Sequence, residues 1–85
     1  MLLTYDDCQN FLEQVIRSLV EFPEDLVVVQ EEQGGKAVLS VSVKKSDVGR
    51  IIGKNGQVIK ALRAVLFAAK SDDLLCDIFI KEDAL

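Results

Sequence analysis

The stretch "GRIIGKNGQVIKAL", residues 49–62, places two glycines around a Lys-Asn pair, directly before the most strongly helical part of the chain. Glycine lets the backbone turn sharply and leaves the amides of the turn uncovered by side chains. At the start of the following helix several N–H groups lack partners, and the helix dipole adds partial positive charge. Residues 53–56 are therefore predicted to give an anion, most commonly a phosphate, close access to backbone donors.

The side chains in and around this turn support an anion site. Lys54 supplies a mobile positive charge, and Asn55 supplies a donor and tolerates unusual backbone angles. Arg50 and Lys60 flank the turn. Its spacing does not match the G-x4-GK[ST] phosphate loop of nucleotide hydrolases, so the sequence does not predict nucleotide hydrolysis.

The charge of the chain is unevenly distributed. The net charge is −4, but residues 1–32 carry −7 and residues 44–63 carry +5. An acidic body with one basic patch suits a small anionic ligand or one thin polyanion strand. The six bases of the patch are Lys44, Lys45, Arg50, Lys54, Lys60 and Arg63.

Three helices are predicted from apolar spacing and end signals. Residues 5–21 place apolar side chains on one helical face, with Thr4 as N-cap and Pro23 as the stop. Ser46 and Asp47 indicate the start of a short helix, and a longer helix runs from the second glycine to about residue 70. The predicted core face of this longer helix contains Val58, Leu62, Val65, Leu66 and Ala69.

Three strands complete the predicted fold. Residues 26–30 are short and β-branched, the polar segment "EEQGGK" is predicted to be a turn, and residues 36–44 alternate as in a half-buried strand. Residues 75–81 alternate as a last strand. The order α-β-β-α-α-β predicts one α+β domain over residues 1–85, in which three helices pack on a three-stranded mixed sheet in two layers.

The segment "IIGKNGQVIKAL" resembles the signature of the KH domain, Ile-Ile-Gly-x-x-Gly-x-x-Ile followed by Lys-x-Leu. The element order is similar to the type II, bacterial arrangement of that fold. KH modules clamp the backbone of about four nucleotides with the GxxG loop. Chain length and residues 46–70 resemble small bacterial proteins that consist of one KH domain. The resemblance implies a non-catalytic single-stranded RNA-binding protein, an RNA chaperone or post-transcriptional regulator in a family connected with cell-envelope and cell-shape control.

The resemblance also assigns roles to residues of this chain. Ile52 and Ile59 are expected to pack under the loop, and the strand at 37–43 is expected to form the opposite wall of the RNA site. No aromatic residue lies between positions 23 and 66, so base stacking near the loop is not expected and one subunit should bind weakly. The residues expected to contact RNA are Gly49, Arg50, Ile51, Gly53, Lys54, Asn55, Gly56 and Lys60.

A second surface is predicted on the long helix. Its back carries a strip of small apolar residues with one phenylalanine, which is suited to a protein partner. The resemblance implies a homodimer, or a heterodimer with a second KH-containing bacterial protein, KhpB (also called Jag or EloR). The residues of this strip are Ala61, Ala64, Phe67 and Ala68.

Several other functions are disfavoured or left as alternatives. The chain has no histidine and no CxxC pair, so the ordinary zinc and triad chemistries are excluded, and no cofactor or small-molecule substrate is expected. Cys8 and Cys76 are predicted to be small core residues of a cytoplasmic protein, with a disulfide as the less favoured reading. No membrane span or signal peptide is expected. The alternatives are a helix-turn-helix DNA binder built on residues 47–69 and a pure interaction module whose RNA groove is unused.

Overall fold

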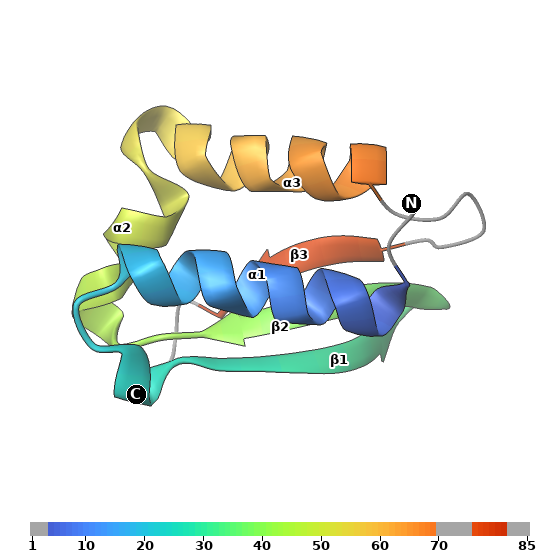
Figure 1. Ribbon diagram of the computed structural model, residues 1–85, viewed down its shortest axis with the longest axis horizontal. Helices are drawn as coiled ribbons and strands as arrows, with labels where there is room; N and C mark the ends of the chain where they lie inside the picture. Colours follow the sequence, from blue (N-terminus) through green and yellow to red (C-terminus); the bar gives the residue numbers. More distant parts are fainter. Residues whose placement is uncertain (1–3, 70–75, 82–85) are drawn as a thin grey trace.

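The computed structural model of the chain describes residues 4–69 and 76–81. Figure 1 shows two long helices lying over one face of a sheet, so the predicted α+β class with a mixed three-stranded sheet is confirmed. Short 3₁₀ turns precede β1, α2 and α3. The elements are α1 (Tyr5–Leu19), β1 (Val27–Gln33), β2 (Lys36–Ser42), α2 (Val48–Ile52), α3 (Gln57–Ala69) and β3 (Cys76–Ile80).

The first helix has the predicted start and a slightly earlier end. The Thr4 hydroxyl accepts from the Asp7 amide at 3.2 Å, and the Thr4 amide donates to the Asp7 carboxylate at 3.1 Å. This reciprocal capping box satisfies two backbone donors that the helix leaves open. The helix ends at Leu19 rather than at residue 21, because Val20 already has extended backbone angles ahead of Phe22 and Pro23.

The sheet has the order β1-β2-β3, with β1 antiparallel and β3 parallel to β2. The hairpin turn is shorter than predicted, because residues 31–33 belong to β1 and pair with residues 36–38. Gly34 and Gly35 alone make the turn, with φ values of 59° and 78°. Two successive positive φ values match the right-handed twist of a two-residue hairpin.

The expectation that β2 is half-buried is wrong. Val38 and Ser40, on the face away from the helices, are as buried as Leu39 and Val41. The reason is that β2 is the central strand, where Val29 of β1 and Phe79 of β3 pair with Ser40 from either side. Alternation in the sequence reports which face a residue is on, but does not report what flanks it.

The core lies between the sheet and the helices. Cys8, which the sequence predicts to be a core residue, is fully buried there, and the side chain of Cys76 lies outside what the structure describes. Val65, predicted to be a core residue, is 48% exposed, because its side of α3 faces the gap toward α1. None of the helices in the described ranges is long and apolar enough to cross a membrane. The core contains Cys8, Leu12, Ile16, Leu26, Val28, Leu39, Val41, Val43, Ile51, Ile59, Leu62, Leu66 and Ile78.

Candidate nucleic-acid interface

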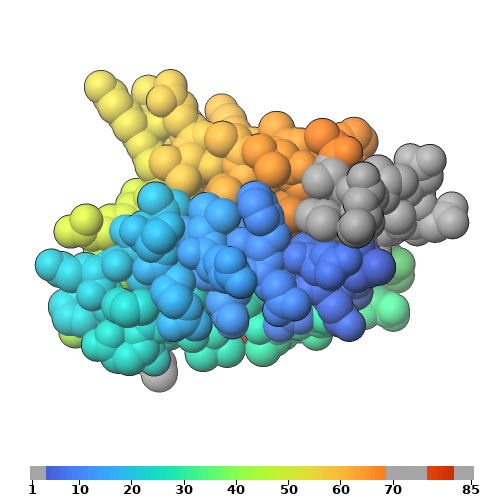
Figure 2. All heavy atoms as spheres, in the orientation of Figure 1, coloured from blue at the N-terminus to red at the C-terminus, as the bar shows by residue number. Residues whose placement is uncertain are grey.

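The turn at residues 53–56 joins α2 to α3 at one corner of the molecule. Figure 2 shows the yellow atoms of this region projecting from the body. Gly53 has φ 80° and ψ 171°, Asn55 has φ 56°, and Gly56 has φ 72°. Asparagine is one of the few residues other than glycine that adopts the left-handed region without large strain, so three positions of the turn match their backbone angles.

Gly53 is dictated by space as well as by its backbone angles. A Cβ at this position would collide with the side chain of Val58 and lie 2.9 Å from the Val58 backbone nitrogen. At Gly56 the nearest atom to such a Cβ is the Lys60 Cε at 3.9 Å, so only the positive φ favours glycine there. The first glycine therefore allows α2 and α3 to approach closely, and the second allows the chain to turn.

The turn leaves two backbone donors open. The Gly53 amide donates to the Gly49 carbonyl at 2.9 Å, and the Gly56 amide donates to the Gly53 carbonyl at 3.1 Å. Across the part of the chain that the structure describes, the amides of Lys54 and Asn55 donate no hydrogen bond, and both residues are exposed. Adjacent amides of this kind can bind an anion.

Two lysines lie at this turn without an ion pair among the described residues. Lys54 is exposed within the turn itself. The side chain of Lys60 runs back toward Gly56, as the 3.9 Å approach of its Cε shows. Long helical side chains point toward the helix N-terminus, so Lys60 places its charge beside the open amides.

The other bases of the predicted patch are mostly engaged by the protein. Lys44 lies over the ring of Phe22, with its Nζ 3.8 Å from the ring centroid. The Arg63 Nη2 donates to the Ile78 carbonyl at 3.0 Å, and its Nε lies 3.2 Å from the Asp77 carboxylate. Arg50 pairs with Asp47 and Glu21 but stays 54% exposed. Among the described residues of this patch, the bases without such a partner are Lys54 and Lys60 at the turn and Lys45, which is exposed in the 3₁₀ turn before α2.

One predicted contact residue is not at the surface. Ile51 is among the residues expected to contact RNA, but its side chain is fully buried, so it cannot touch RNA. Ile52, expected to pack under the loop, is half-buried and packs against the core, and Ile59 is buried as expected. Gly49 is exposed, and a Cβ there would meet nothing within 4 Å. Ile51 and Ile52 point about 100° apart on α2, so one enters the core fully and the other packs at its edge, and the sequence does not show which.

The strand in contact with α3 differs from the one expected to form the opposite wall. Residues 37–43 lie mainly in β2, which is paired on both sides by β1 and β3. The strand that reaches α3 is β3, through the contacts of Arg63 with Asp77 and Ile78. A strand alongside the loop helices must therefore be β3, because the sheet order puts β2 in the middle.

Sequence reasoning missed the role of Asp47. This residue stands at the N-cap position of α2 but makes no cap bond. Its carboxylate is fully buried and accepts from the amides of Glu21 and Phe22 at 3.0 Å and 2.9 Å. The available signal was its isolation, since Asp47 is the one acid among the six bases of residues 44–63.

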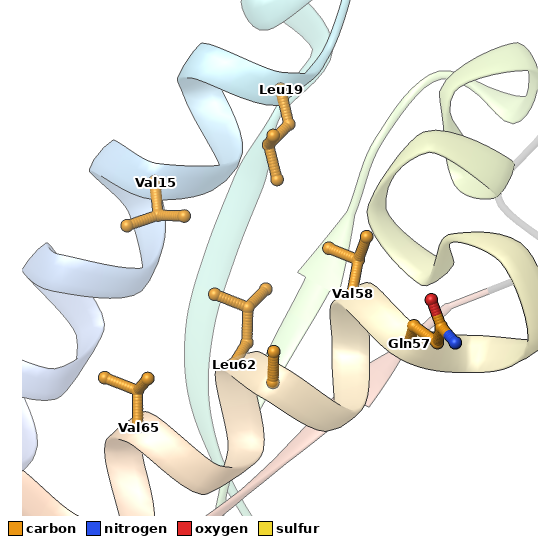
Figure 3. Close-up of a pocket in the computed structure, with 7 residues that line it drawn as sticks. Val15, Leu19, Gln57, Val58, Leu62 and Val65 are labelled. Atoms are coloured by element: carbon orange, nitrogen blue, oxygen red, sulfur yellow. The ribbon is translucent and has the colours of Figure 1, made fainter.

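The predicted interaction strip on α3 is exposed, and Phe67 is 73% exposed. One edge of this strip adjoins a groove. Ala61 lies beside an apolar groove of about 320 Å³ between α1 and α3, in which Val15 and Leu19 face Val58, Leu62 and Val65 (Figure 3). At 3.6 residues per turn, Phe67 lies about 120° around the helix from Ala61, with Ala64 between them. The exposed apolar surface of α3 therefore extends from the groove beside Ala61 to Phe67.

Comparisons with known proteins agree with this geometry. The family model described as "KhpA/KhpB, KH domain" matches residues 9–74. A relative from Oceanobacillus iheyensis, named RNA-binding protein KhpA, is 43% identical over 61 residues, covering 72% of this chain and 81% of the relative. Relatives of the same name from Thermotoga maritima and Bacillus subtilis are each 39% identical, covering 75% and 79% of this chain and 85% and 83% of their own. No solved structure gives a significant match.

Proposed function

The chain belongs to the KhpA/KhpB KH-domain family, and on this premise we propose that it is a non-catalytic protein that binds single-stranded RNA through residues 53–56. The observation that carries the proposal is the pair of open amides at Lys54 and Asn55, with the charges of Lys54 and Lys60 beside them. Phosphodiester oxygens accept from such amides, and lysines neutralise their charge. Gly49, Arg50 and the glycines of the turn border the same path.

The working role that we propose is that of a cytoplasmic RNA chaperone or post-transcriptional regulator, with a link to cell-envelope and cell-shape control. The affinity of one subunit should be low, because the described residues near the turn offer lysines and backbone donors but no aromatic platform. Binding that depends on the backbone rather than on base edges tolerates many sequences.

We expect two such modules to act together, as a homodimer or as a heterodimer with a second KH protein of the KhpB (Jag, EloR) type. The exposed residues Ala61, Ala64, Phe67 and Ala68 support a partner surface on α3, and the apolar groove beside Ala61 extends it. Two linked sites raise the apparent affinity for one strand through effective concentration.

The structure disfavours the DNA-binding alternative. A recognition helix needs polar side chains on its outward face to read base edges in the major groove. Beyond Gln57 and Lys60 at its start, the outward face of α3 carries mostly alanines and Phe67, and Arg63 is engaged with β3. A preference for duplex DNA over single-stranded RNA would nevertheless reverse the proposal.

The test replaces both Lys54 and Asn55 by Asp and leaves the glycines in place. Two carboxylates where phosphate would lie should reduce RNA affinity at least tenfold, as measured by fluorescence anisotropy with a single-stranded oligonucleotide. The thermal midpoint should stay within a few degrees, because both side chains are exposed.

A matched control replaces Gln33 and Lys36 by Asp. These residues flank the hairpin turn at the opposite end of the molecule, and the net charge changes by the same amount. The control should bind RNA within about twofold of the unmodified protein. Equal losses in both variants would mean that overall charge, and not the 53–56 turn, governs binding. Dimerisation without any RNA binding would favour the pure interaction module.

A further inference from the structure

Asp47 connects two segments that are 25 residues apart. Its two carboxylate oxygens accept from the consecutive amides of Glu21 and Phe22, which lie in the segment that follows α1. The carboxylate is fully buried, so these hydrogen bonds are shielded from water. The five-residue helix α2 cannot be stable alone, and Asp47 fastens its first turn to the rest of the protein.

The same carboxylate also holds Arg50. The Arg50 Nε lies 3.3 Å from Asp47 Oδ1, whereas its Nη2 is 4.0 Å from the nearest oxygen of Glu21. Guanidinium is planar and presents five donors in a fixed fork. The ion pair at Nε restrains the guanidinium on the side of Asp47, and the longer contact to exposed Glu21 leaves the outer nitrogens accessible.

We infer that Asp47 is a positioning residue for RNA binding: from its buried place it orients the Arg50 guanidinium as a fork for a backbone phosphate next to those held by residues 53–56. This inference rests on the proposed function. In this inference, one phosphate contact depends on a buried acid. The other acids of the protein repel RNA. A bidentate arginine–phosphate contact needs a fixed guanidinium plane, which a free arginine side chain lacks.

The direction in which Asp47→Asn changes RNA affinity distinguishes this positioning role from a general effect of net charge. Asp47→Asn removes a negative charge, so a simple charge argument predicts tighter RNA binding. If Asp47 orients Arg50, the same substitution weakens binding, because the amide holds the guanidinium without charge assistance and presents a donor to one of the two backbone amides. Asp25→Asn, at an exposed aspartate in the turn before β1, removes the same charge and serves as the matched control.

The experiment measures the Kd for a single-stranded RNA in four proteins: the unmodified chain, Asp47→Asn, Arg50→Gln, and the double variant. Asp47→Asn should weaken binding about fivefold, but change it less than about twofold in the Arg50→Gln background, because the residue acts through Arg50. The slope of log Kd against log salt should also fall by about 0.7 in magnitude for Asp47→Asn, the loss of one phosphate contact. Asp25→Asn should leave both values unchanged.

An equal loss in both backgrounds would show that Asp47 has a structural role only, and tighter binding by Asp47→Asn would overturn the inference. If the Asp47→Asn variant unfolds at the assay temperature, the Arg50→Lys variant is measured in its place. That variant keeps the charge and leaves the Asp47 contacts with Glu21 and Phe22 intact, and binding as tight as that of the unmodified chain would refute the oriented fork. Absence of RNA binding in the unmodified chain would instead refute the proposed function.

Discussion

Gly53 is fixed by two independent constraints, its backbone angles and the lack of space for a Cβ beside Val58. The combination of φ 80° and ψ 171° is reached almost exclusively by glycine. Asn55 carries a milder version of the same constraint, since its φ of 56° suits asparagine. At the scale of single residues, the turn is thus specified by the positions at which a side chain is excluded or tolerated.

Gly53→Ala should lower the free energy of unfolding by about 2 kcal/mol or more, because it adds a left-handed strain and a collision with Val58. Urea unfolding of the purified variant measures this loss.

Gly49→Ala is the matched control for that substitution. Gly49 lies inside α2 with open space around a Cβ, so alanine there should raise the free energy of unfolding by about 0.5 kcal/mol through its better helix propensity. A Gly53→Ala variant as stable as the unmodified protein would contradict the close approach of α2 and α3 that the structure shows.

The helix α3 shows how one element divides its charges between two tasks. Lys60 and Arg63 are one turn apart and looked equivalent in the sequence. Arg63 satisfies the Ile78 carbonyl of β3 and pairs with Asp77, whose carboxylate accepts from the Ile78 amide at 2.7 Å. The arginine therefore serves the fold, while Lys60 stays beside the turn.

Replacing each residue by alanine should separate these tasks. Arg63→Ala should lower the free energy of unfolding by about 1 kcal/mol, because the Ile78 carbonyl loses a charge-assisted hydrogen bond at a half-exposed site. Its RNA affinity should stay within about twofold.

Lys60→Ala should show the reverse pattern. The free energy of unfolding should change by less than about 0.5 kcal/mol, since an exposed lysine that pairs with no acid in residues 4–69 or 76–81 is replaced by the best helix former. RNA affinity should fall about threefold or more through the loss of one phosphate contact. Anisotropy and urea unfolding on the same samples give both values, and a similar pattern for the two variants would invalidate the division of tasks.

The molecule as a whole has an acidic body with a basic corner. Residues 1–32 hold eight of the 14 acids, whereas residues 44–63 hold one acid and six bases. A polyanion would be repelled by the body and attracted to the corner, so at the proposed site this charge distribution would orient RNA as well as attract it. The helix α3 begins at this corner and also carries the exposed apolar surface. Two chains paired through α3 would therefore present two such corners.

Phe67→Asp should shift the protein from dimer to monomer in sedimentation experiments, because a carboxylate would be buried in the proposed interface. Val65→Asp tests the other side of α3, at the groove toward α1. The control is Val27→Asp, which places the same charge on an exposed valine of β1, away from α3, and should leave the dimer intact. Dimers that survive both α3 substitutions would move the interface elsewhere.

The amino-acid sequence by itself determined the order of helices and strands, the N-cap at Thr4, the glycine turn of the hairpin and the turn at residues 53–56. These features depend on backbone angles and periodicities within a few consecutive residues, which the residue types specify directly. The KH resemblance came from the same local pattern.

The tertiary structure alone decided which of Ile51 and Ile52 enters the core, which bases remain available, and what Asp47 binds. Each of these depends on what an element faces, and the partners come from distant segments, such as Phe22 for Asp47 and Ile78 for Arg63. Periodicity gives the angle of a residue around its own helix or strand, but the neighbour at that angle is set by the packing of the whole chain.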